Sequence, residues 1–97
     1  MKHFIIEITY TGTAEEIGAT VSDHRAFLQT GYDLGWLLVS GPQVPCTGGM
    51  IVARAPSLAE IQDFFKNDPY QIKGLAAYRF VEFEPVKHQD VLKSWLG

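Results

Sequence analysis

The feature that most constrains the fold is a helix-start signal that occurs twice, each time directly after a β-rich segment. Thr13–Glu16 and Ser57–Glu60 both have the form of a capping box, in which a Ser or Thr and a Glu three residues later satisfy free backbone N–H groups. The alternating segment Lys2–Tyr10 precedes the first signal, and Met50–Ala55 precedes the second. Each signal therefore marks the point at which a strand gives way to a helix.

Two more segments have strand character, Trp36–Gly41 and Leu75–Glu84. The resulting order is strand, helix, strand, strand, helix, strand. It predicts an α+β fold of the ferredoxin-like βαββαβ type, with a four-stranded antiparallel sheet and both helices on one face. Between the two middle strands, Pro42–Gly49 would form an eight-residue loop. That is longer than the usual hairpin connection of roughly two to five residues, so we expect the loop to line a site.

The first helix is expected to run from its cap at Thr13 to about Asp33. Its core-facing stripe includes a histidine and consists of Ile17, Val21, His24, Leu28 and Gly31. Ser22-Asp23 could cap a second segment, so the sequence is compatible with one helix or two.

The second helix is expected to end at Asn67-Asp68-Pro69-Tyr70, after a buried stripe of Leu58, Ile61, Phe64 and Phe65. Pro69 cannot continue the helix, and it pushes Asp68 towards an extended backbone. A carboxylate just past a helix C-terminus is disfavoured by roughly 0.3–1 kcal/mol when exposed. Asp68 is therefore either a turn former or a carboxylate held out to meet a distant partner.

Length and composition indicate one domain, residues 1–97, with a C-terminal tail over 86–97. The net charge of −3 and the scattered basic residues argue against nucleic-acid binding, which needs a basic face. The single cysteine fits a reducing compartment, and neither a membrane span nor a signal peptide is recognisable. We therefore expect a cytoplasmic protein without a membrane partner. The three histidines have no zinc-ligand spacing, so neither a metal nor another cofactor is expected.

The sheet face opposite the helices should be largely apolar, because it carries Ile5, Val81 and Phe83. Exposed apolar patches of that size are rare, and covering one is favourable by about 25 cal/mol per Å². We therefore expect a homodimer, or a higher oligomer, packed sheet against sheet. The tail should place Val91, Leu92, Trp95 and Leu96 on one side of a short helix that docks on its own domain or on a neighbouring subunit.

Taken in order, these motifs resemble those of the YciI-like (YCII-related) family of small dimeric α+β-barrel proteins. The matching features are the opening strand, His24–Leu28, Gly35–Pro42, the Gly-Gly before the third strand, Ser57–Glu60, Asn67–Tyr70 and Lys73–Leu75. The resemblance implies a dimeric α+β barrel whose active site is a His–Asp pair, matching His24 and Asp68, with the Gly41-Pro42 turn alongside. One departure is visible. The family often has Arg-Pro just before the His, where this chain has Val21-Ser22-Asp23.

The residues themselves also favour pairing His24 with Asp68. No carboxylate occupies the helix positions three and four residues from His24, which are Thr20, Val21, Phe27 and Leu28. A charged partner would have to come from across the fold, although a histidine on an apolar stripe can also be a packed core residue. In the expected dyad Asp68 orients one imidazole nitrogen, and the other nitrogen acts as general base or acid. Ser40 could offer a hydroxyl to a ligand and Tyr70 could form a pocket wall.

No side chain has the surroundings of an activated nucleophile: Cys46 lies in a loop without a nearby histidine, and Ser40 lacks a hydrolase elbow. The sequence therefore favours a small cofactor-independent enzyme that transfers protons on a small organic molecule, in a lyase or isomerase reaction. Its predicted catalytic residues are His24 and Asp68, and its predicted substrate-binding residues are Ser40, Gly41, Pro42 and Tyr70. The alternatives are a non-catalytic domain that binds a small molecule or serves an assembly through the same cleft, and a purely structural dimer.

Overall fold

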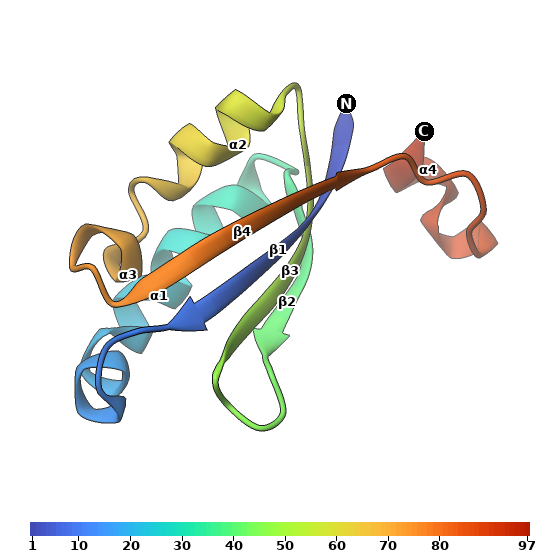
Figure 1. The fold of residues 1–97 in the computed structure, drawn as a ribbon. Helices are drawn as coiled ribbons and strands as arrows, with labels where there is room; N and C mark the ends of the chain where they lie inside the picture. Colours follow the sequence, from blue (N-terminus) through green and yellow to red (C-terminus); the bar gives the residue numbers. More distant parts are fainter.

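In the computed structural model, which describes residues 1–97, the elements follow the predicted order. The strands are β1 (Lys2–Tyr10), β2 (Leu37–Pro42), β3 (Gly48–Ala55) and β4 (Ala76–Phe83), and they form one antiparallel sheet of order β2-β3-β1-β4. The three helices α1 (Ala14–Asp33), α2 (Leu58–Phe65) and α3 (Pro69–Ile72) lie on one side of this sheet (Figure 1). The predicted α+β, ferredoxin-like fold is confirmed. None of the helices combines the length and apolarity of a membrane-spanning segment.

The core lies between the sheet and the helices α1 and α2. Alternate residues of β1 point towards the helices, and Phe4 and Ile6 are completely buried there. Ile61 and Phe65 of α2 pack into the same cluster. The predicted stripe of α2 is wrong at Leu58, which is 38% exposed because it is the first residue of the helix.

Helix α1 is a single segment of 20 residues, which decides between the two alternatives that the sequence left open. Its capping box is complete: the Thr13 hydroxyl accepts from the Glu16 N–H at 3.1 Å, and the Glu16 carboxylate accepts from the Thr13 N–H at 2.9 Å. At α2 the box is half-formed. Ser57 accepts from the Glu60 N–H, but the Glu60 carboxylate takes the Ser57 hydroxyl instead of the backbone N–H.

The loop between β2 and β3 is shorter than predicted, because Pro42 and Gly49 are paired in the ladder and only residues 43–47 remain outside it. Pro42 is tolerated because β2 is an edge strand, where a missing N–H breaks no ladder. Gly48 is required by close approach, since an added Cβ would overlap the backbone carbonyl of Ile8. Pro42 ends β2, and Gly48 and Gly49 begin β3, where the sequence suggested an open loop.

The link after α2 also differs from the prediction, because it contains the helical turn α3. Asp68 has the extended backbone expected before Pro69, with φ −66° and ψ 126°. It is the N-cap of α3, where its carboxylate accepts from the Tyr70 N–H at 3.1 Å. The unfavourable position predicted at the end of α2 is therefore a favourable position at the start of the next helix.

The tail forms a short 3₁₀ turn, η1 (Asp90–Leu92), and a helical turn, α4 (Lys93–Leu96), beyond the end of β4 (Figure 1). It docks on its own domain through Arg54, whose guanidinium lies 4.0 Å from the ring centre of Trp95 and donates to the Trp95 carbonyl at 2.8 Å. The predicted apolar side is wrong at Val91, which is 83% exposed.

Candidate functional site

His24 and Asp68 meet across 44 positions of chain. His24 lies in the middle of α1, and Asp68 lies between α2 and α3. The Nδ1 atom of His24 is 2.8 Å from Oδ1 and 3.0 Å from Oδ2 of Asp68. The spatial pairing expected from the sequence is therefore present, and it holds α1 against the segment that follows α2.

The Asp68 carboxylate is completely buried and receives three hydrogen bonds. Besides the His24 ring, the Tyr78 hydroxyl donates to Oδ2 at 2.6 Å and the Tyr70 N–H donates to Oδ1. Burial raises the pKa of Tyr78, and the hydrogen bond to Asp68 adds to this effect, so Tyr78 remains a donor at neutral pH. Three converging donors compensate for burying a charged oxygen pair.

Tyr70 supports the other side of the dyad. Its ring stacks on the imidazole of His24 with centroids 4.1 Å apart and planes 18° apart, and Tyr10 packs edge-on against it at 5.6 Å. Burial raises the pKa of both tyrosines, so both hydroxyls stay protonated at neutral pH. The imidazole is thus fixed by a carboxylate at one nitrogen and by an aromatic ring along its face.

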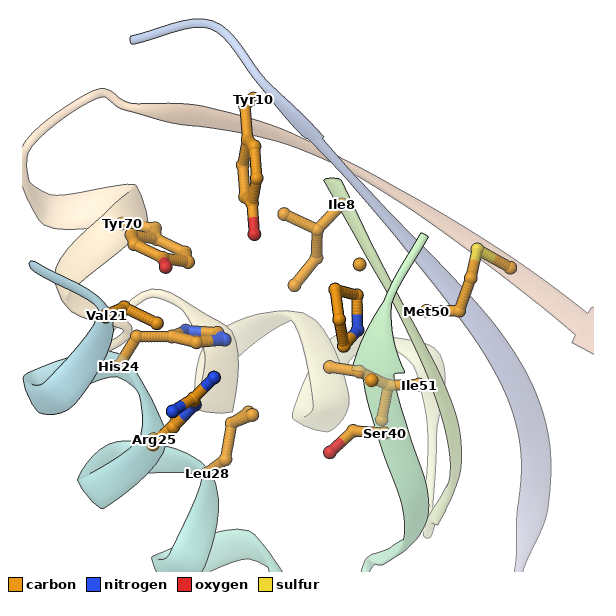
Figure 2. Close-up of a pocket in the computed structure, with 13 residues that line it drawn as sticks. Ile8, Tyr10, Val21, His24, Arg25, Leu28, Ser40, Met50, Ile51 and Tyr70 are labelled. Carbon is orange, nitrogen blue, oxygen red and sulfur yellow. The ribbon is translucent and has the colours of Figure 1, made fainter. Parts of the chain in front are cut away.

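The second nitrogen of His24 faces a cavity of about 230 Å³ (Figure 2). This cavity lies between α1 and the ends of β1, β2 and β3, with Ile8, Leu28 and Ile51 among its apolar walls. It contains no carboxylate, and His24 is the only lining residue of a type that commonly binds metals. A neutral imidazole bonded to Asp68 through Nδ1–H presents a lone pair on Nε2 to this space, which is the arrangement of a general base.

The predicted binding residues Ser40, Gly41, Pro42 and Tyr70 all line the cavity. The Ser40 hydroxyl is already engaged, because its oxygen lies 2.7 Å from the Tyr32 hydroxyl. Of the loop predicted over Pro42–Gly49, the two end residues line the cavity and residues 43–47 do not. The expectation that this loop lines a site is therefore confirmed only at its ends, which belong to β2 and β3.

Sequence reasoning missed three residues of the site: Tyr10, Arg25 and Tyr78. Tyr10 and Arg25 line the cavity, and the Tyr78 hydroxyl donates a hydrogen bond to the Asp68 carboxylate. Tyr78 lies within the strand predicted over Leu75–Glu84, but strand character alone does not identify a hydrogen-bond partner. Arg25 is an exposed residue of α1 whose side chain borders the cavity, so the sequence alone does not distinguish it from an ordinary surface cation.

Comparison with known proteins supports the assignment of the fold and the family. Among curated proteins, none matches the sequence. One similar solved structure is 5-chloro-2-hydroxyhydroquinone dehydrochlorinase (TftG) from Burkholderia phenoliruptrix AC1100, in complex with 2,5-dihydroxybenzoquinone. It is 24% identical, with a TM-score of 0.70, and the match covers 92% of this chain and 97% of that one. A family model for the YCII-related domain matches residues 1–84, and the chain therefore belongs to the YCII-related family.

Proposed function

We propose that this protein is a small enzyme that transfers protons on a small organic molecule, with His24 as general base and acid and Asp68 as its orienting partner. One observation carries the proposal: a histidine bonded to a fully buried aspartate through Nδ1 presents its other nitrogen to a cavity. A histidine that serves only packing has no need of an opening beside its free nitrogen. The proposal requires no cofactor.

The chemistry follows from the two nitrogens. Asp68 accepts a hydrogen bond from Nδ1–H of His24 and so fixes the tautomer in which Nε2 can take a proton from a substrate carbon or hydroxyl. The imidazolium that results is stabilised by the same carboxylate. It can then return the proton to another substrate atom, which gives an isomerisation, or to a departing group, which gives an elimination. The structural neighbour is a dehydrochlorinase, so the fold accommodates an elimination in that protein.

The test measures proton exchange between substrate and solvent, because exchange is a step common to isomerisations and eliminations. The purified protein is incubated in deuterium oxide with small carbonyl compounds and hydroxyquinones, and exchange is followed by proton NMR. Release of chloride from 5-chloro-2-hydroxyhydroquinone is measured in parallel. We expect activity on at least one compound, and we expect His24→Ala to lower it by about 10²–10⁴-fold. Asp68→Asn should lower it as well, because the amide cannot stabilise the imidazolium.

His88→Ala is the matched control, because His88 is exposed and bonds only to the neighbouring Gln89 carbonyl. Full activity in His24→Ala would refute the proposal. Saturable binding of a compound at the cavity without exchange or turnover of any compound would favour the alternative, a non-catalytic binding domain.

We also propose that the chain is a homodimer, packed through the sheet face that points away from the helices. An apolar row crosses all four strands on this face, because Val39 pairs with Val52, Val52 with Ile5, and Ile5 with Val81. Val39 is 54% exposed and Phe83 is 41% exposed. Such a surface is unfavourable in water and is suited to a second copy of itself.

Light scattering after gel filtration tests the dimer. The wild type should have twice the mass of the chain, and Val81→Glu should shift it to the monomer by burying a charge in the interface. Gln62→Glu is the control, because it adds the same charge to the exposed side of α2. A monomeric wild type would contradict the proposal.

A further inference from the structure

The cavity beside His24 is lined by a cation, Arg25, that makes no ion pair within the protein. Of its lining residues only His24 and Arg25 can be cationic, and no Asp or Glu is among them. Asp68 does not balance Arg25, since it is completely buried behind the imidazole and its oxygens already accept three hydrogen bonds.

Arg25 itself has no partner of opposite charge. The ion pairs in the chain are His24–Asp68 and Lys66–Asp63. Arg54 provides a contrast, because it bonds to two backbone carbonyls and stacks on Trp95. In Figure 2 the guanidinium of Arg25 points from α1 into the same space as the His24 ring, across from Ile8 and Ile51. A guanidinium has five N–H donors, so this one can bind two oxygens of a ligand at once.

A second observation points to a ligand. The Tyr70 hydroxyl is buried and has no hydrogen-bond partner in the protein. Tyr70 lines the same cavity, and the hydroxyl of Tyr10 points into it (Figure 2). Arg25 lies close enough to draw the pKa of both tyrosines downward, although burial outweighs it. The cavity therefore combines a cation, two neutral hydroxyl donors and apolar walls.

We infer that the cavity takes a small organic anion, whose carboxylate or enolate oxygens bind Arg25 while its carbon skeleton packs against Ile8 and Ile51. The volume of about 230 Å³ lies below the range of roughly 300–1,000 Å³ for drug-sized ligands, so the anion is small. This inference names the substrate class for the proposed function and rests on it for the role of His24. Binding of the anion does not require that role. Where a reaction removes a proton from carbon, the same guanidinium also stabilises the negative charge that develops.

Two probes of similar shape distinguish binding that depends on the ligand's charge from binding that depends on its shape. Benzoate is anionic, and benzamide is neutral. Their affinities are measured by titration followed through backbone amide NMR signals. We expect benzoate to shift the signals of cavity residues and to bind roughly tenfold or more tightly than benzamide. Arg25→Gln should weaken benzoate by roughly tenfold or more and leave benzamide unchanged. Arg25→Lys should retain part of the affinity for benzoate, since lysine keeps the positive charge but lacks the planar guanidinium that can donate to two oxygens at once.

Lys66→Gln is the control for net charge, because it removes one positive charge at the end of α2, outside the cavity. Equal affinity for the two probes, or benzoate binding that survives Arg25→Gln, would overturn the inference. So would the absence of cavity shifts with benzoate, salicylate and 2,5-dihydroxybenzoquinone alike. If benzoate did not bind through Arg25 but the wild type catalysed proton exchange and His24→Ala did not, the anion-binding inference would be refuted and the proposed function would stand. Anion binding without any exchange would leave only the binding site.

Discussion

Removing one hydroxyl tests whether the buried carboxylate depends on its converging donors. In Tyr78→Phe the ring stays in place against Phe65 and Phe80, and only the donor 2.6 Å from Asp68 Oδ2 is lost. Because Asp68 is 0% exposed, water cannot readily replace that donor. A hydrogen bond to a charged group contributes about 1.5–3 kcal/mol, and we expect the free energy of unfolding to fall by about that amount.

Thermal unfolding at fixed protein concentration measures the effect, since an oligomer's stability depends on concentration. For a domain of this size about 1 kcal/mol corresponds to roughly 4–8 °C in Tm, so Tyr78→Phe should lower Tm by roughly 6–24 °C. Tyr32→Phe is the matched control, because its hydroxyl meets the neutral Ser40 hydroxyl at 2.7 Å. That bond should contribute only about 0.5–1.5 kcal/mol. A loss in Tyr78→Phe no larger than in Tyr32→Phe would refute the reasoning.

Two further predictions concern backbone space and buried phenols. Gly48→Ala should destabilise the fold strongly, because its Cβ would overlap the Ile8 carbonyl. Gly18→Ala in α1 meets nothing within 4 Å and should raise the free energy of unfolding by up to about 1 kcal/mol, and denaturant unfolding compares the two. The raised pKa values of Tyr10, Tyr70 and Tyr78 mean that the native state disfavours phenolate. The free energy of unfolding should therefore be intact below about pH 10 and fall as pH rises above it. In a pH titration followed by phenolate absorbance, the native protein should ionise at higher pH than the unfolded chain. Titration of the native and unfolded chains at the same pH would contradict this prediction.

The order of the elements could be predicted because its signals are local. The caps at Thr13 and Ser57 and the alternation of β1 depend on residues a few positions apart. The loop before β3 was misjudged for the opposite reason. Pro42 is acceptable only because β2 is at the sheet edge, and Gly48 is needed only because β1 passes close by. Both facts concern neighbours that the local sequence does not reveal.

The candidate site divides in the same way. His24 and Asp68 stood out because each was unusual where it lay, one on an apolar helix stripe and one beside a helix-ending proline. Tyr78 and Arg25 were ordinary where they lay, one on an alternating strand and one after a histidine on a helix. Their importance comes from what they face, which depends on how α1 packs against the sheet.

The carboxylate at position 68 has two tasks, since it caps α3 through the Tyr70 N–H and also holds the imidazole of His24. Altering it to suit another ligand would also loosen the bend that seats Tyr70. Gly41 and Pro42 line the same cavity from the end of β2, and a Cβ added at Gly41 would meet nothing within 4 Å. Redesign of the cavity for new ligands should therefore begin at Gly41 and Pro42 and leave Asp68 unchanged.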